Sequence, residues 1–72
     1  MEKIIKIIED NKKQIKTSYD VRYNLIKAGV DKDFADLLSY KADEYRDKSS
    51  HDGIVYPIHE CAICALEELF DI

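Results

Sequence analysis

The sequence predicts an all-α fold, a small bundle of four short helices with an extended loop before the last helix. Apolar residues recur at helical spacing through four segments. Capping residues and a glycine mark where these segments begin and end. One short apolar run, residues 54–56, has no partner strand and so predicts no sheet. With 72 residues, the chain is expected to form a single helical domain over residues 1–72, near the lower size limit for a self-sufficient core.

The first helix is predicted over residues 2–16. Ile4, Ile8, Asn11 and Ile15 share one helical face, which we expect to point to the core. Lysines follow at positions 12, 13 and 16, where a positive charge suits the carboxyl end of a helix. The pattern therefore predicts that this helix ends at about residue 16.

The second helix is bounded by local signals. Thr17 or Ser18 is suited to cap its start, with Asp20 in the first turn. Gly29 is expected to end it in a left-handed conformation, with Val30 packing back as the apolar partner of that turn. The helix carries two apolar stripes, so we expect it to be sandwiched or to face a partner: Tyr19, Tyr23 and Ile26 form one stripe, and Val21, Leu25 and Ala28 form the other.

The third helix is predicted to start after an Asp31 cap and to run to about residue 47 or 48. Its expected core stripe is Phe34, Leu38, Ala42 and Tyr45, with Ala35 and Leu37 beside it. A serine pair and Asp52-Gly53 then indicate a loop. Residues 54–56 are apolar enough that we expect them to lie across the core as an extended strap.

The fourth helix is expected to have Pro57 in its first turn and to continue almost to residue 72. Its apolar residues cover an arc of about 200°, wider than one core face requires. We expect a central helix, and the alternative is a homodimer that buries this arc at a two-fold axis. The residues of the arc are Ile58, Cys61, Ala62, Ile63, Ala65, Leu66, Leu69 and Phe70.

The charge distribution limits the partners. Residues 31–72 contain eleven acids and four lysines or arginines. Such a field repels nucleic acid and anionic lipid and attracts basic protein surfaces, so we expect no direct nucleic-acid or membrane binding.

The start of the chain lacks the uninterrupted apolar run of a signal peptide. Two cysteines are too few for a secreted disulfide framework, and a cytoplasmic location is expected.

The turn between the second and third helices weakly matches the spacing of a helix-turn-helix, with Gly29, Val30 and Leu38 roughly at the positions of its turn glycine and two core residues. However, Asp31, Asp33 and Asp36 would occupy the positions that face DNA. DNA binding draws most of its affinity from cations that neutralise phosphates. The spacing therefore does not indicate a DNA reader.

The third helix instead carries what we call the acidic ridge. A projection at about 100° per residue places five acids in one sector around Tyr40. The simplest interpretation is a solvated face, and the alternative is a docking surface in which an aromatic is surrounded by steering charges. On the second interpretation, the protein is a non-enzymatic regulator or inhibitor, of a kind that phages encode, which binds a basic and nucleic-acid-binding surface of a partner protein. The candidate binding residues are Asp33, Asp36, Tyr40, Asp43, Glu44 and Asp47.

The cysteines and histidines are weaker candidates for a functional site, as metal ligands or as catalytic residues. Cys61 and Cys64 can converge on one side of a helix, but His59 points away, so a zinc site would need His51 or Asp52 to fold over. A metal-binding regulator therefore remains a third alternative, and no metal or cofactor is expected. Cys61 is interpreted as a core residue and Cys64 as a half-exposed residue with a raised pKa. The sequence has no catalytic motif, and so short a chain is expected to be unable to enclose a substrate pocket of usual size.

Overall fold

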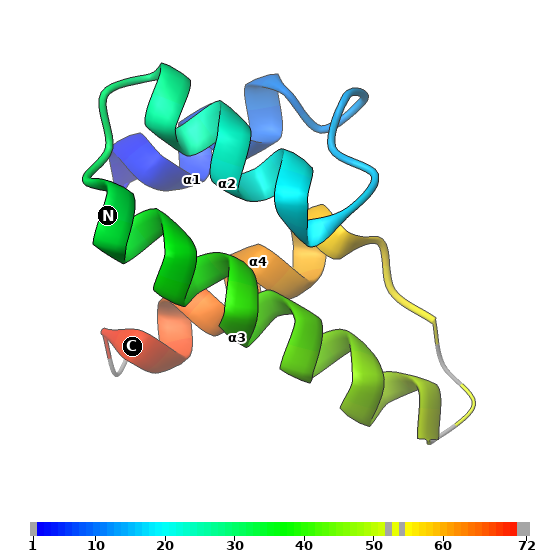
Figure 1. Ribbon diagram of the computed structural model, residues 1–72. Coiled ribbons are helices and arrows are strands. Elements are labelled where there is room, and N and C mark those ends of the chain that lie inside the picture. Colours follow the sequence, from blue (N-terminus) through cyan, green and yellow to red (C-terminus); the bar gives the residue numbers. More distant parts are fainter. Residues whose placement is uncertain (1, 52, 54, 71–72) are drawn as a thin grey trace.

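The computed structural model describes residues 2–51, 53 and 55–70. It contains four helices, α1 (Glu2–Asp10), α2 (Ser18–Lys27), α3 (Lys32–His51) and α4 (Ile58–Leu69) (Figure 1). No described residue lies in a strand. The predicted all-α bundle of four helices is therefore confirmed.

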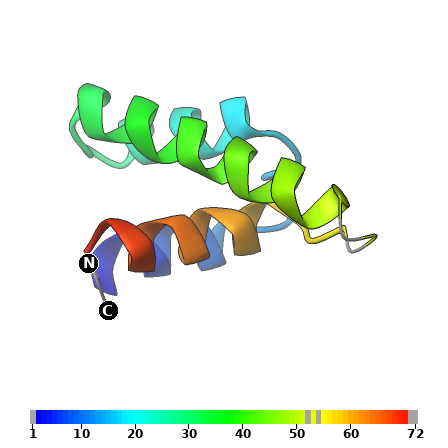
Figure 2. The same ribbon diagram turned by 90° about the horizontal axis from the view of Figure 1, so that it is seen from below.

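The helices form two layers. In Figure 2, α2 and α3 lie side by side in one layer, and α1 and α4 lie in the other. The core is the space between the layers, where side chains from all four helices meet. Within the described residues, no helix combines the length and the apolar character that a membrane crossing requires.

The core is wholly apolar within the described residues. No polar or charged residue is buried there, and no buried side-chain nitrogen or oxygen lacks a hydrogen-bond partner. Most of its members come from the predicted stripes, and α4 supplies the largest share, as a central helix should. The buried residues are Ile8, Ile15, Val21, Leu25, Ala35, Leu38, Ala42, Ile58, Cys61, Ala62, Ala65 and Leu66.

The predicted cap of α2 forms around Thr17. The Thr17 hydroxyl accepts a hydrogen bond from the backbone N–H of Asp20, and the Asp20 carboxylate accepts one from the backbone N–H of Thr17. This reciprocal pair satisfies two N–H groups that a helix start leaves without partners. The Asp20 carboxylate also accepts a bond from the N–H of Lys16 at 2.9 Å. These bonds fix the direction in which the chain enters α2.

The turn between α2 and α3 has the predicted form. Gly29 is left-handed, with φ of 96°. Its N–H donates to the carbonyl of Ile26, and the N–H of Val30 donates to the carbonyl of Leu25 at 2.9 Å. This pair of bonds is the Schellman arrangement, and Val30 packs against the core as expected. Asp31 then caps α3 by accepting a hydrogen bond from the N–H of Phe34 at 3.1 Å.

The expected length of the first helix is wrong, because α1 ends at Asp10 and turns follow over residues 11–14. Asn11 offers a local reason, since its side-chain amide donates to the carbonyl of Ile7 at 2.8 Å and competes for helical hydrogen bonds. Tight turn bonds follow, such as that from the N–H of Gln14 to the carbonyl of Asn11. Ile15 still reaches the core, but from this turn segment.

The expected end of the third helix is also corrected, because α3 continues to His51. The hydroxyls of Ser49 and Ser50 donate to backbone carbonyls of the preceding turn, so the serine pair is accommodated within the helix. The following connection joins α3 to α4 at one end of the bundle (Figure 1). Val55 is 72% exposed, so the expected strap does not cover the core there, and Ile54 lies outside the described residues.

The predicted apolar stripes are only partly buried. In α2, Val21 and Leu25 are fully buried, whereas Ala28, Tyr19 and Tyr23 are exposed. In α3 and α4, the predicted core residues Phe34, Tyr45, Ile63 and Leu69 are partly buried, whereas Leu37 and Phe70 are exposed. The rings of Phe34 and Phe70 nevertheless lie with their centroids 6.0 Å apart. The wide arc of α4 is thus largely used within one chain, and Pro57 directly precedes this helix as its N-cap.

Candidate functional site

The acidic ridge lies on α3, and none of its residues lines the pocket between α3 and α4. All six predicted residues belong to this helix, and none of them is buried. Tyr40 is 64% exposed, to about the same extent as Tyr19 on α2, which is 66% exposed. Asp33, Asp43 and Asp47 are exposed, and Asp36 and Glu44 are half-buried.

Two ridge carboxylates contact α2. The Arg22 guanidinium donates through Nε to the carboxylate of Asp36 and forms an ion pair with it. The hydroxyl of Ser18 donates to the carboxylate of Asp43 at 2.8 Å. Asp36 and Asp43 therefore also connect α3 to α2 at the surface, contacts that the helical projection of α3 alone did not indicate.

The remaining acids differ in their surroundings. Glu44 lies 3.7 Å from the ammonium of Lys41, one turn away on the same helix. Asp33 stands in the first turn of α3, where a negative charge stabilises the helix. Asp47 stands near the carboxyl end of α3, where the helix dipole disfavours an acid. Neither Asp33 nor Asp47 forms an ion pair with another described residue, so both charges face solvent.

An aromatic surface lies beside the ridge on α2. Tyr19 is 66% exposed and Tyr23 is 52% exposed, so these two members of the predicted stripe face outward, whereas Ile26 packs against the core. The ammonium of Lys27 lies 6.0 Å from the centroid of the Tyr23 ring. The surface encloses a shallow hollow of about 340 Å³, lined by Tyr19, Arg22, Tyr23, Ile26 and Lys27.

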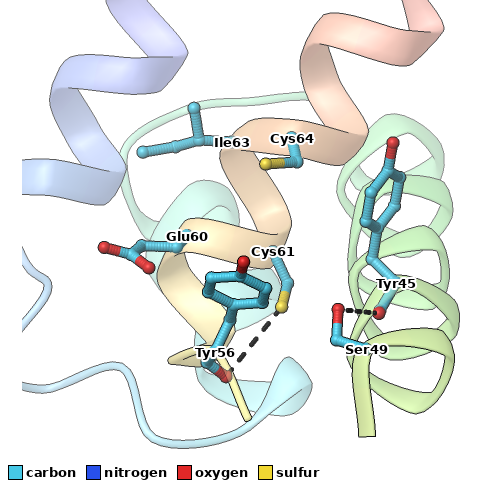
Figure 3. A pocket seen from close by; sticks show the side chains of 7 residues that line it. All are labelled: Tyr45, Ser49, Tyr56, Glu60, Cys61, Ile63 and Cys64. Atoms are coloured by element: carbon cyan, nitrogen blue, oxygen red, sulfur yellow. Dashed lines mark hydrogen bonds between the residues drawn. The ribbon is translucent and has the colours of Figure 1, made fainter. Parts of the chain in front are cut away.

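A larger pocket opens between α3 and α4 (Figure 3). Its volume is about 480 Å³, within the range of small-molecule sites, although the pocket is open to solvent on one side and does not enclose a ligand. The pocket lies between the second half of α3 and the first half of α4, and Tyr56, whose backbone carbonyl accepts a long hydrogen bond from the Cys61 thiol at 4.0 Å, belongs to the segment that precedes α4. Its lining residues are Tyr45, Ser49, Tyr56, Glu60, Cys61, Ile63 and Cys64.

Both cysteines lie on this pocket, and their environments match the predicted ones. Cys61 is buried and Cys64 is exposed, and both are free thiols. Burial raises the pKa of the Cys61 thiol, with a smaller contribution from Cys64. Burial also raises the pKa of the Cys64 thiol, and the carboxylates of Glu67 and Glu60 raise it further. Both groups are therefore thiols at neutral pH, which disfavours nucleophilic chemistry.

The metal alternative gains no support from the geometry. No cluster of three or more histidines, cysteines or acids suited to hold a metal ion is present in the described part of the chain. His51 lies at the end of α3, whereas both cysteines lie on α4, and neither His51 nor His59 is among the described residues that line the pocket with them. Asp52 lies outside the described residues.

No family model, curated protein or solved structure matches this chain. The functional argument therefore depends on the ridge, the tyrosine surface and the pocket.

Proposed function

We propose that this protein is a small non-enzymatic binding module that docks its acidic ridge on a basic surface of another protein. The observation that carries the proposal is Tyr40, which is 64% exposed in the middle of the ridge. A tyrosine in this setting supplies contact area at low entropic cost, while the acids around it steer a basic partner.

The neighbouring tyrosines extend this surface. Tyr19 and Tyr23 stand on α2 beside the ridge, in the same layer of the bundle. A partner that covers Tyr40 and Tyr19 together would bury an aromatic centre with acids on the α3 side, which is the anatomy of many interfaces. A surface that binds phosphates is one basic partner of this kind, and the carboxylates would then occupy the phosphate positions. This fits a regulator or inhibitor of a nucleic-acid-binding protein.

The structure indicates which acids to change in a test. Asp36 and Asp43 bond to α2, so their reversal would disturb packing as well as binding. Asp33 and Asp47 face solvent, and their reversal to lysine is expected to leave the fold intact. A matched control is the double reversal of Glu9 and Asp10, which are exposed on α1. Either double variant moves the formal net charge from −4 to zero.

The experiment is affinity capture from bacterial lysate at low and at raised salt, with each variant immobilised. We expect the same bound proteins for the native chain and the α1 control, and their loss with the Asp33 and Asp47 double reversal. Raised salt should release them, because exposed charges are screened over about 10 Å at 0.1 M ionic strength. Tyr40→Ala should weaken retention by increasing dissociation. If the Asp33 and Asp47 double reversal retains the same proteins as the control, the ridge is a solvated face and the proposal is wrong.

The homodimer alternative is separated by mass in solution. Five residues of the α4 arc are already buried within one chain, which leaves little of the arc for a second copy. We therefore expect light scattering to give the mass of a monomer. A stable dimer disrupted by Phe70→Ser would support the alternative.

A further inference from the structure

We propose that the pocket between α3 and α4 binds a small organic cation, an amine with an aromatic or alkyl body. None of the ridge residues lines this pocket, so the inference goes beyond the proposed function. It rests on the volume of the pocket, on its apolar walls and on the sign of the charges around it.

The pocket is shaped for a compact ligand with an apolar body. Its volume of about 480 Å³ exceeds that of a single aromatic ring with a short chain. Figure 3 shows Tyr45 on one side and Tyr56 on the other, with the two cysteines on the α4 wall between them. Because burial raises the pKa of both thiols, the two cysteine side chains are uncharged at neutral pH. Neutral sulfur is polarisable and packs well against aromatic rings.

The charges around the pocket select the sign of the ligand. Glu60 is the one charged side chain among the described residues that line it. Two further carboxylates lie close by, since Glu67 raises the pKa of Cys64 and hydrogen bonding to Glu68 raises the pKa of Tyr45. Arg46 has the opposite influence on Cys61 but does not line the pocket. The net field favours a cation and disfavours an anion.

The tyrosine rings supply a direct interaction with such a cation. A cation within about 6 Å of the face of an aromatic ring is attracted by the ring quadrupole, and aromatic walls with a nearby acid are a common way to hold alkylammonium groups. Tyr56 is 45% exposed at the edge of the pocket, and Tyr45 is partly buried on the α3 wall. A bound ammonium group is thus expected near Tyr56 on the Glu60 side, with its apolar body towards Cys61 and Ile63.

The test uses three probes with the same ring and different charge, 2-naphthylmethylamine, 2-naphthylmethanol and 2-naphthoate, titrated into the full chain and followed by two-dimensional NMR. We expect the amine to shift the amide signals of residues 45, 49, 56 and 60–64. Its affinity should exceed that of the alcohol by roughly three- to tenfold, the range expected for one cation–aromatic contact with a nearby acid. The carboxylate should bind weakest.

Two pairs of variants locate the interaction. Glu60→Gln keeps the shape of the side chain and should remove most of the preference for the amine over the alcohol, whereas Asp33→Asn on the ridge should leave it unchanged. Tyr56→Ala should reduce binding of both probes, whereas Tyr56→Phe should retain it. Because Tyr56 is partly exposed, the fold is expected to survive both changes, and circular dichroism checks this.

A second readout is the exposed thiol on the pocket wall. A saturating concentration of 2-naphthylmethylamine should slow alkylation of the Cys64 thiol by iodoacetamide, which is a neutral reagent. The same concentration should not slow this alkylation in a chain that is unfolded in urea. The proposal is overturned if no probe shifts the pocket signals, or if the carboxylate binds as tightly as the amine. These results are independent of the ridge experiment, because reversal of Asp33 and Asp47 leaves every pocket residue in place.

Discussion

Arg22 on α2 donates to the carboxylate of Asp36 on α3, so one acid of the ridge also joins two helices of the same layer. The two side chains are 30% and 47% exposed, and water screens their attraction. We expect a double-mutant cycle with Arg22→Gln and Asp36→Asn to give a coupling energy below about 1 kcal/mol. The measurement is urea unfolding of the four proteins. A coupling of several kcal/mol would mean that the pair is shielded from water.

Leu38→Ala tests the assignment of the α3 core face. Leu38 is fully buried between the layers, so its truncation should cost roughly 2 to 5 kcal/mol, which is a large part of the stability of so small a domain. The adjacent Leu37 is 45% exposed, and Leu37→Ala serves as the matched control with a change within about 0.5 kcal/mol. Thermal unfolding of both variants checks the prediction. Equal losses at the two positions would contradict the assigned face.

Gly29→Ala tests the turn between α2 and α3. Gly29 has φ of 96°, and a Cβ built there meets no atom within 4 Å. The penalty should therefore come from backbone strain alone, about 1 kcal/mol or slightly more. Gly29→Asn should cost less, because asparagine tolerates left-handed backbone better. Denaturant unfolding ranks the three proteins, and an alanine variant as stable as the native chain would show that this turn has a different conformation.

Asp20→Ala tests the capping box and predicts a dependence on pH. Hydrogen bonds from the backbone N–H groups of Lys16 and Thr17 lower the pKa of Asp20 below its ordinary value of 3.8, in spite of an opposing effect of burial. A lowered folded-state pKa means that the charged carboxylate stabilises the fold above pH 3.8 and that this contribution is lost as the pH falls through the folded-state pKa. The native chain should therefore melt at a higher temperature than the variant at pH 7, and the difference should shrink towards pH 2. A difference that stays constant over this range would contradict the role of the carboxylate charge.

The parts of the fold that the sequence predicted are those set by neighbouring residues. Thr17, Gly29 and Asp31 act on backbone groups within a few positions, so their roles follow from local chemistry. The ends of α1 and α3 were less predictable. They depend on whether Asn11 and Ser49 bond to the preceding turn, which the same side chains do in some contexts and not in others.

The candidate sites also contain features that could be predicted from the sequence and features that could not. The composition of the acidic ridge follows from helical geometry, because all its residues belong to one helix. The bonds from α2 to Asp36 and Asp43 depend on how two helices pack, and no pattern within α3 indicates them. The pocket joins residues of α3, α4 and the connection between them, so only the assembled bundle shows it.

The length of α3 has a consequence for hydrogen exchange. None of residues 46–51 is buried, so the last turns of this helix have few tertiary contacts that oppose local opening. Their amides should lose protection well before those around Leu38, through fraying that leaves the rest of the bundle folded. Ser49 belongs to this region and Tyr45 directly precedes it, and both residues line the pocket. This wall of the pocket therefore belongs to a part of the molecule that opens more readily than the core. A ligand that contacts the wall would bind the helical state and so shift the local opening equilibrium towards it.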